Sequence, residues 1–249
     1  MCGRYASMRD TADLVLLTGA ADETDPTDDA DNAGPDPVKS ANVAPTDRVR
    51  VLLSFDGQRV LRRHVWGLIP PWSTGPQGAA RMINARVETV TEKPSYRRAV
   101  RTSRCLLPAD AWYEWQVAEQ GRVPHLVKRS DERPLWLAGV WARWHPPDGG
   151  PVVASASVLT GPAPQELAWL HDRAPLVVPD SFMDTWLESD GGDPQDVLDT
   201  LGSVGYPPLD WYRIGRGIGQ VRDKGAHLML PVTDEPSDRP GRDEPAVLF

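Results

Sequence analysis

The chain has 249 residues, with 27 basic residues against 35 acidic ones and a net charge of −8. No apolar run approaches the roughly 20 residues that a membrane-spanning helix needs, so a soluble globular protein is expected rather than a membrane protein. Two cysteines are too few for a disulfide scaffold, and the first residues carry no apolar stretch of the signal-peptide kind, so a cytoplasmic location is expected.

The first 40 residues contain one predicted helix and one long predicted loop. Ser7 is a typical N-cap residue ahead of an apolar run, and Gly19 is typical of a helix end, which predicts a short helix between them. Residues 20–37 are mostly Asp, Ala, Thr, Pro and Gly, and such a segment cannot bury enough apolar surface to order itself. This segment is therefore predicted to be an acidic surface loop.

The middle of the chain is predicted to be rich in β-strands. Asp56-Gly57 lies between two apolar runs, which is a strong short-range signal for a β-hairpin. It predicts strands at residues 49–55 and 58–66. Further runs between Gly, Pro and charged turns predict strands at residues 104–107, 112–116, 124–128, 135–144 and 152–160.

Signals for helix starts return after residue 160. Pro164, Asp180 and Asp193-Pro194 are each predicted to open a short helix, the last one ending at Gly202. Many short strands without βαβ alternation favour the α+β class, with antiparallel sheets around one core. One domain is expected at residues 1–232, followed by a flexible tail at residues 233–249.

Positive charge is concentrated in one segment. Residues 48–104 hold eleven Arg and one Lys against three acids, a net charge of +9, whereas residues 22–36 and 180–199 hold seven acids each and no base. A basic surface on an acidic protein is the pattern expected of a protein that binds a polyanion. Charge alone favours a solvated arginine-rich surface, so it does not establish polyanion binding.

Cys2 has a chemistry that internal cysteines cannot offer. Removal of Met1 would leave an α-amine and a thiol on adjacent carbons, and this 1,2-aminothiol can condense with an aldehyde to form a five-membered thiazolidine. Such an amine and thiol have ordinary pKa values of roughly 8 and 8.5 and are mostly protonated at neutral pH, so a neighbouring base is required. A cysteine at position two can equally be accidental, so this residue does not establish the chemistry by itself.

Several separated motifs together indicate a family. They are Met1-Cys2-Gly3-Arg4-Tyr5-Ala6, Asn42-Val43-Ala44-Pro45-Thr46, Trp66-Gly67-Leu68-Ile69-Pro70-Pro71-Trp72, Ile83-Asn84-Ala85-Arg86-Val87-Glu88-Thr89, Arg104-Cys105-Leu106-Leu107-Pro108-Ala109-Asp110, Trp112-Tyr113-Glu114-Trp115 and His171-Asp172-Arg173. In order and spacing the chain resembles, over residues 1–232, the SRAP family of SOS response-associated peptidase-like proteins. The resemblance implies an α+β fold in which antiparallel sheets form a barrel-like core with peripheral short helices. It also implies processing of abasic sites in single-stranded DNA during the DNA damage and SOS response.

The resemblance implies four catalytic residues. The family's nucleophile falls on Cys2, its asparagine on Asn84, its glutamate on Glu114 and its histidine on His171. Glu114 is expected to exchange protons with the Cys2 amine, and His171 to open the closed abasic sugar and so expose its aldehyde. Asn84 is expected to orient the opened sugar or the amine. The implied product is a slowly reversible thiazolidine cross-link that shields the lesion, accompanied by a weaker β-elimination lyase activity.

The resemblance also implies a DNA-binding set: three arginines that face phosphates, one aromatic wedge beside the lesion, and three residues of adjoining segments. In that order they are Arg4, Arg86, Arg173, Trp72, Asn42, Pro45 and Thr160. The prolines before Trp72 indicate a stiff, exposed loop, whereas Trp66 is expected in the core. Stacking on an aromatic ring accepts any base, so no sequence specificity is expected.

The predicted function is therefore that of a monomeric, cofactor-free sensor and covalent shield of abasic sites, located in the cytoplasm at the nucleoid, with no replication partner identified. Two alternatives stay open. In one, Cys2 is the N-terminal nucleophile of an autoproteolytic cysteine peptidase; in the other, the chain is a non-catalytic single-stranded DNA-binding module in which Cys2 has no role. The five histidines and two cysteines show no ligand-like spacing, so no metal site is expected.

Overall fold

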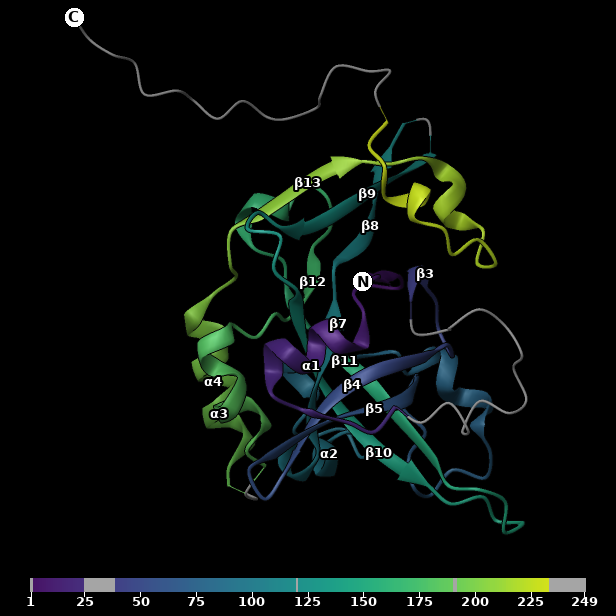
Figure 1. The fold of residues 1–249 in the computed structure, drawn as a ribbon, viewed down its shortest axis with the longest axis vertical. Helices are drawn as coiled ribbons and strands as arrows, with labels where there is room; N and C mark the ends of the chain where they lie inside the picture. Colours follow the sequence, from purple (N-terminus) through teal and green to yellow (C-terminus); the bar gives the residue numbers. More distant parts are fainter. Residues whose placement is uncertain (1, 25–38, 120, 190–191, 233–249) are drawn as a thin grey trace, which may run out of the picture.

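The computed structural model describes residues 2–24, 39–119, 121–189 and 192–232, and the strands of these residues form two sheets (Figure 1). The five-stranded sheet has the order β13–β9–β8–β1–β3, and its strands are β1 (Tyr5–Ser7), β3 (Ser40–Val43), β8 (Ala111–Ala118), β9 (Gly121–Arg129) and β13 (Leu209–Arg213). The eight-stranded sheet has the order β12–β11–β10–β7–β4–β5–β2, with β6 beside β11. Its strands are β2 (Ala21–Asp22), β4 (Arg48–Phe55), β5 (Gln58–Trp66), β6 (Asn84–Arg86), β7 (Arg104–Ala109), β10 (Leu135–Trp144), β11 (Val153–Pro162) and β12 (Arg173–Pro175).

Five strands of the larger sheet form a closed circuit. β11 pairs antiparallel with β10 and parallel with β5, and β4 pairs with both β5 and β7, which in turn pairs with β10. Because successive side chains of a strand point to opposite faces, Cys105 and Leu107 of β7 pack into one apolar cluster and Leu106 into another. Both faces of β7 are buried, which explains why its sequence is a continuous apolar run rather than an alternating one.

The helices are short and lie around the sheets (Figure 1). They are α1 (Thr11–Thr18), α2 (Arg97–Thr102), α3 (Met183–Leu187) and α4 (Pro194–Val204), together with the single-turn or two-turn 3₁₀ segments η2 (Pro76–Arg81), η3 (Val87–Thr89), η4 (Gln165–Leu167), η5 (Asp180–Phe182), η6 (Arg216–Gly219) and η7 (Ala226–Met229). None of the helices in the described ranges is long and apolar enough to cross a membrane.

The predicted α+β class is confirmed, and so is the predicted hairpin. Asp56 and Gly57 both have positive φ, 51° and 76°, which is the turn geometry that matches the twist of two paired strands. The strands predicted at residues 58–66 and 135–144 are β5 and β10, with the same bounds. The other predicted strands are found with ends shifted by a few residues.

Three predicted helix starts differ from the structure. Ser7 does not cap α1 but ends β1, where its hydroxyl accepts from Nη2 of Arg50 at 2.8 Å; Asp10 takes the N-cap position, while Gly19 ends the helix with φ 65° as predicted. Pro164 precedes only the single turn η4. Asp180 caps no helix but is the first residue of η5, and its carboxylate accepts from Nε1 of Trp136 instead.

The start predicted at Asp193-Pro194 is confirmed, since the Asp193 carboxylate accepts from the backbone N–H of Gln195 at 3.0 Å. The helix does not end at Gly202 but continues to Val204. The predicted loop at residues 20–37 begins differently, because Ala21–Asp22 form β2 against β5. Residues 25–38 of that loop and the predicted tail at residues 233–249 lie outside the described residues.

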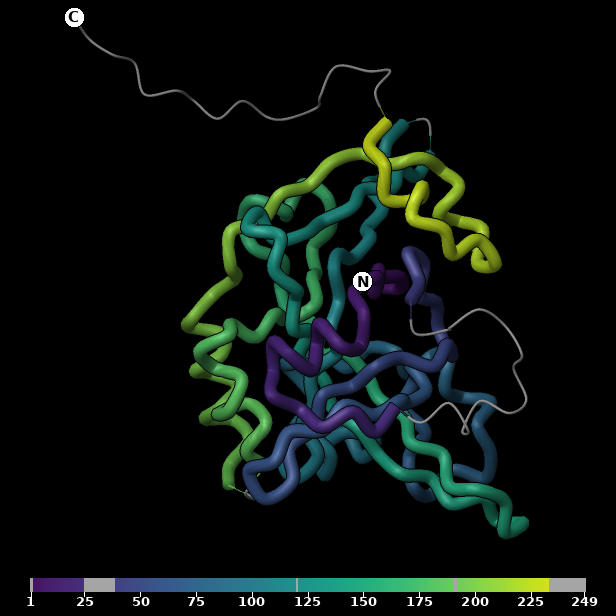
Figure 2. The backbone as a smooth tube through the Cα atoms, viewed as in Figure 1, coloured from purple at the N-terminus to yellow at the C-terminus, as the bar shows by residue number. Residues whose placement is uncertain are grey.

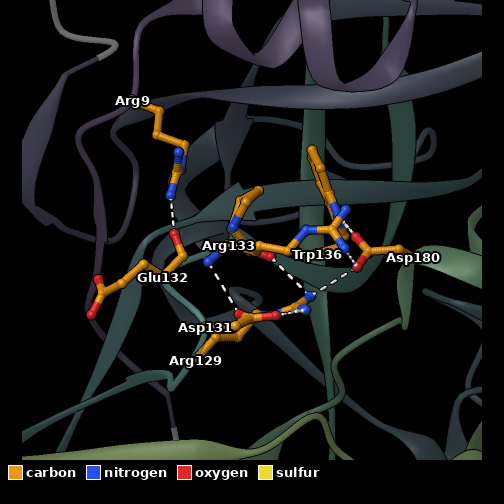
Figure 3. A network of polar contacts seen from close by, with 8 residues as sticks. Arg9, Arg129, Asp131, Glu132, Arg133, Trp136 and Asp180 are labelled. Carbon is orange, nitrogen blue, oxygen red and sulfur yellow. Dashed lines mark hydrogen bonds and ion pairs between the residues drawn. The ribbon is translucent and has the colours of Figure 1, made fainter.

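Asp180 joins η5 to the β9–β10 connection (Figure 3). Its carboxylate accepts from Nε1 of Trp136 at 2.8 Å and from Nη1 of Arg129 at 3.2 Å, and Nη1 of Arg133 lies 3.1 Å away. Arg129 is almost fully buried and donates also to Asp131. A buried guanidinium is thus neutralised by two carboxylates, as its burial requires.

The chain crosses from one sheet to the other at Asp110, between β7 and β8. There the Asp110 carboxylate accepts from the backbone N–H groups of Met8 and Arg9 and so fixes the end of β1. The N-terminal segment consequently runs through the middle of the molecule, between the strands of the two sheets (Figure 2). This position places Cys2 close to β8.

Candidate active site

Cys2 is fully buried, three residues before the first residue of β1. Its carbonyl oxygen accepts from Nδ2 of Asn84 at 2.7 Å, and its thiol lies 3.6 Å from the carbonyl oxygen of Arg4. That same carbonyl of Arg4 accepts from the backbone N–H of Tyr113 at 3.0 Å. Cys2 is therefore held by β6 on one side and by β8 on the other.

The environment of the Cys2 thiol disfavours the thiolate. Burial raises the pKa of the thiol far above its ordinary value, and the negative charge of the nearby Glu114 carboxylate raises the pKa further. Glu114 itself is buried in β8. Cys2 and Glu114, which are 112 positions apart in the sequence, thus interact electrostatically through the pairing of β1 with β8.

A cavity of about 480 Å³ adjoins these residues. Its walls come from five parts of the chain: the N-terminal segment, β8, β9, the segment after η4, and η6. The residues that line it are Gly3, Arg4, Glu114, Trp115, Val117, Arg122, Pro124, His171 and Arg216. The structure therefore brings Glu114 and His171, both predicted from the sequence, to one cavity beside Cys2. It adds Trp115, Arg122 and Arg216, which the sequence did not single out.

Nδ1 of His171 lies between two possible partners. It is 3.0 Å from the backbone N–H of Arg173 and 2.7 Å from Oδ1 of Asp172. One nitrogen cannot accept from the first and donate to the second at the same time, so the Arg173 contact fits Nδ1 without a proton and the Asp172 contact fits Nδ1 with one. Such a group can exchange a proton without losing its position.

Asn84 has one amide atom engaged and one available. Nδ2 donates to Cys2, whereas Oδ1 is buried and has no hydrogen-bond partner among the described residues. The backbone carbonyl of Asn84 accepts from the hydroxyl of Tyr96 at 3.3 Å. A buried acceptor without a donor is costly, which makes this oxygen a natural contact for an incoming polar group.

Arg4 and Asn42 form one unit. Nη1 of Arg4 donates to Oδ1 of Asn42 at 2.7 Å and to the carbonyl of Ile218 at 3.2 Å. Asn42 is fully buried, and its Nδ2 donates to the carbonyls of Ile218, Gln220 and Asp223 at 3.2, 2.9 and 3.0 Å. In this arrangement Asn42 fixes Arg4 at the cavity and also anchors the η6 segment.

Arg173 is fixed by Glu88 and Thr160. Its guanidinium makes two parallel hydrogen bonds to the Glu88 carboxylate, at 2.8 and 2.9 Å, and one to the backbone carbonyl of Thr160 at 2.7 Å. These contacts raise the pKa of Arg173 and lower the pKa of the Glu88 carboxyl. The side chain of Thr160 is fully buried, so Thr160 positions Arg173 through its backbone.

The remaining predicted DNA-binding residues lie at different depths. Arg86 is exposed on β6, and Pro45 is half-buried in the turn between β3 and β4. Trp72 is 60% exposed, as its proline-rich loop predicts, whereas Trp66 is in the core as expected. Trp72 does not line the cavity beside Cys2; it lines a second cavity of about 350 Å³, and the two cavities share no lining residue.

The described residues contain no group of three or more His, Cys, Asp or Glu side chains that could hold a metal ion. The fold and site define a class of protein: an α+β fold in which a cysteine at position two adjoins a cavity that presents a carboxylate and an imidazole.

A family model described as SOS response associated peptidase (SRAP) matches residues 1–221, so the chain belongs to the SRAP family. It is 29% identical over 191 residues to the abasic site processing protein YoqW of Bacillus subtilis (strain 168), covering 76% of this chain and 85% of that protein. It is 29% identical over 233 residues to the abasic site processing protein YedK of Escherichia coli (strain K12), covering 93% of this chain and 100% of that protein. Among solved structures, a protein of Bacteroides thetaiotaomicron has the same fold, with a TM-score of 0.78 at 19% identity, covering 93% of this chain and 100% of that one.

Proposed function

We propose that this protein processes abasic sites in single-stranded DNA by forming a covalent thiazolidine with the sugar through Cys2, after removal of Met1. The single observation that carries the proposal is the placement of Glu114 and His171 on one cavity directly beside Cys2. Abasic-site processing as such is also supported by the names of the relatives YoqW and YedK.

The thiol environment favours attack by the amine first. A thiol whose pKa is raised by burial and by Glu114 is protonated at neutral pH and is a poor nucleophile. Once Met1 is gone, Glu114 accepts a proton from the Cys2 ammonium group. The free amine adds to C1′ of the open-chain sugar, and the hydroxyl formed there leaves as water with a proton returned by Glu114, which gives an imine.

The sulfur then closes the ring. The thiol adds to the imine carbon, so that a C–S bond forms while the C=N double bond becomes a C–N single bond, and the thiol proton ends on the nitrogen. The five-membered product contains both heteroatoms of Cys2. Reversal needs the same proton transfers in the opposite order, and loss of the 3′ phosphate from the imine by β-elimination would be the accompanying lyase reaction.

His171 supplies the step that precedes capture. An abasic deoxyribose is mostly a closed hemiacetal, so its ring oxygen must gain a proton while its C1′ hydroxyl loses one. His171 lies on the same cavity, and its Nδ1 has a partner with or without a proton, which suits the ring to this transfer. The buried Oδ1 of Asn84 would accept from the Cys2 amine or from a sugar hydroxyl.

The arginines of the site supply the phosphate contacts. Arg4, Arg122 and Arg216 line the cavity, and Arg173 and Arg86 extend the positive charge along β12 and β6. Asn42 and Thr160 act on the DNA indirectly in this proposal, because both are buried and hold Arg4 and Arg173.

Covalent capture can be tested with a single-stranded oligonucleotide that carries one abasic site. The Met1-processed protein is incubated with it and run on a denaturing gel beside Cys2→Ala and Cys2→Ser; Cys105→Ala, which changes the other buried cysteine, is the matched control. A shifted band is expected for the wild type and Cys105→Ala only. If the processed wild type gives no band, covalent capture is refuted.

The two alternatives are further outcomes of this test. Equal binding of intact and damaged strands without a band would support a non-catalytic binding module. Loss of Met1 from the purified chain that depends on Cys2, with no DNA adduct, would support the peptidase.

A further inference from the structure

His125 is a buried histidine of β9 that the reaction proposed above does not use. Its side chain is 5% exposed, and it does not line the cavity beside Cys2. The two residues that follow it, Leu126 and Val127, are apolar and fully buried. An imidazole in such surroundings costs free energy unless its nitrogens have polar partners. The polar neighbours of His125 therefore decide what the ring can do.

The register of the five-stranded sheet places His125 between two charged residues. Glu114 of β8 is paired with it on one side, and Arg213 of β13 on the other. Directly paired residues of antiparallel strands point to the same face of the sheet, with Cβ atoms roughly 4.5–5.5 Å apart. Glu114, His125 and Arg213 thus form one row across this face. Glu114, at the end of the row, is as deeply buried as His125.

The protonation of one ring nitrogen follows from its partner. Nδ1 of His125 lies 3.2 Å from the carbonyl oxygen of Val123, which can only accept, so Nδ1 carries a proton. The other nitrogen, Nε2, belongs to a ring whose paired neighbour is Glu114. With a proton, Nε2 donates to an ionised carboxylate; without one, it accepts from a protonated carboxyl group. It can therefore serve Glu114 before and after a proton transfer.

The ring of His125 is also fixed by the segment that carries His171. Trp169 packs edge-to-face on His125, with ring centroids 5.2 Å apart and planes at 86°. Trp169 and His171 lie in one tight turn, because the backbone N–H of His171 donates to the carbonyl of Leu167 at 3.2 Å. His125 consequently lies between Glu114 and the turn that presents His171 to the cavity.

We propose that His125 is a positioning residue that holds the Glu114 carboxylate through Nε2, while Val123 and Trp169 hold its ring. The inference rests on the proposed function, because Glu114 moves the protons of that reaction. His125 lies outside the cavity lining and touches no substrate. A change at His125 is therefore expected to slow the covalent step and to leave DNA binding unaltered.

His125→Phe keeps an aromatic ring against Trp169 and removes both nitrogens. The cross-linking rate at saturating abasic strand is expected to fall about tenfold, whereas the strand concentration that gives half the maximal rate should stay the same. His64→Phe is the matched control, because His64 is the other buried histidine and does not line the cavity. Circular dichroism checks that both variants are folded. Equal maximal rates for the two variants would overturn the proposal.

His125→Gln separates the nitrogen from the ring. Its side-chain amide can reach the position of Nε2 and can donate or accept, but it has no ring to pack on Trp169. This variant is expected to keep more of the maximal rate than His125→Phe. The opposite order would mean that only the packing of the ring matters, and would refute the positioning of Glu114.

The effect of His125 must pass through Glu114. In a chain that already carries Glu114→Gln, His125→Phe is expected to slow the reaction by less than about twofold, because the carboxylate that His125 holds is gone. A further tenfold loss would show that His125 acts independently of Glu114, and would overturn the proposal.

The contact can also be measured without any reaction. Proton–nitrogen correlation spectra of the histidine rings resolve the two nitrogens, and His125→Phe identifies the signals of His125. Glu114→Gln is expected to shift the Nε2 signal more than the Nδ1 signal, because Nδ1 keeps its Val123 partner. Glu119→Gln, at an exposed position in the turn between β8 and β9, should shift neither. An unchanged Nε2 signal in Glu114→Gln would overturn the contact.

The positioning role and the proposed function fail in different ways. If the wild type cross-links and His125→Phe reacts as fast as His64→Phe, only the role of His125 is refuted. If Glu114→Gln shifts the Nε2 signal but the wild type forms no cross-link, the contact stands and only the proposed function is refuted.

Discussion

At the scale of single residues, Cys2 has surroundings that keep its thiol protonated. Glu114 raises the pKa of the thiol and at the same time offers a carboxylate that can accept a proton. Asn84 fixes the Cys2 carbonyl, and Arg4 is fixed by Asn42. Cys2 and Glu114 thus take part directly in the proposed reaction, whereas Asn84 and Asn42 hold Cys2 and Arg4 in position.

The role of Glu114 can be tested with Glu114→Gln. This change is expected to slow cross-link formation about 100-fold at pH 7, because proton transfer by a positioned group contributes about that much. The defect should shrink above the amine's ordinary pKa of about 8, where the amine is already deprotonated. The rates are read from quenched time points on denaturing gels between pH 6 and pH 9.5.

Glu119→Gln is the matched control for that experiment, because Glu119 is exposed at the end of the same hairpin. An unchanged rate for Glu114→Gln at pH 7 would remove the carboxylate from the mechanism.

The pair of Glu88 and Arg173 makes stability depend on pH. Hydrogen bonds from Arg173 lower the pKa of Glu88 in the folded chain, so the stabilisation is fully present above the unfolded pKa of about 4.3 and is lost as the pH falls through the lowered value. The Glu88 side chain is 45% exposed, and solvent screening keeps its contribution below about 1 kcal/mol.

Glu88→Gln is therefore expected to lower the free energy of unfolding by less than about 1 kcal/mol at pH 7 and to have a smaller effect at pH 3. Urea unfolding at the two pH values measures the difference. A larger loss at pH 3 than at pH 7 would contradict this account.

The sequence singled out Cys2, Asn84, Glu114 and His171 because they stand in short, specific motifs, and the structure brings Glu114 and His171 to one cavity. The sequence did not show Arg122 and Arg216. They reach the cavity only because β9 pairs with β8 and because Asn42 anchors η6, and such long-range contacts leave no local pattern.

At the scale of elements, the sequence predicted the strands that have a strong local signal and missed the short strands that have none. The Asp56-Gly57 turn fixes β4 against β5, and the apolar run of β10 defines a strand by itself. β1, β6 and β12 have three residues each and exist only through pairing with longer strands. Ser7 shows the same effect, since its pairing and its bond to Arg50 override its preference for a helix cap.

The Asp180 cluster is expected to stabilise the β9–β10 connection. Asp180→Ala removes partners from Trp136, Arg133 and the buried Arg129, and should lower the free energy of unfolding by about 2 kcal/mol, since hydrogen bonds to charged groups contribute most. Urea unfolding at pH 7 measures this loss.

Asp184→Ala is the control for that experiment, because Asp184 pairs with Arg59 at the surface with 73% of its side chain exposed. Its effect should stay below about 1 kcal/mol. Equal effects of the two changes would mean that the cluster adds no more than an exposed ion pair.

At the scale of the whole molecule, charge is divided between regions. The chain as a whole carries −8, yet residues 48–104 carry +9 and supply most of the second cavity, while Arg4, Arg122 and Arg216 line the first. This division allows an acidic protein to bind a polyanion through one part of its surface.

Binding of an undamaged single strand should therefore weaken steeply with salt in spite of the net negative charge. The logarithm of the affinity is expected to fall linearly with the logarithm of the salt concentration, by about 0.7 for each phosphate neutralised. Anisotropy titrations between 50 and 300 mM NaCl, roughly a sixfold range, measure the slope. A slope near zero would contradict phosphate binding by the arginines.

The central claim is that both heteroatoms of Cys2 join the abasic sugar, and mass spectrometry of the cross-linked N-terminal peptide tests it most directly. After nuclease and trypsin treatment, the peptide Cys2-Gly3-Arg4 should carry the sugar remnant with loss of one water, should resist thiol alkylation and should contain no primary amine. A remnant on another residue, or a peptide that still has a free thiol or a primary amine, would contradict the thiazolidine.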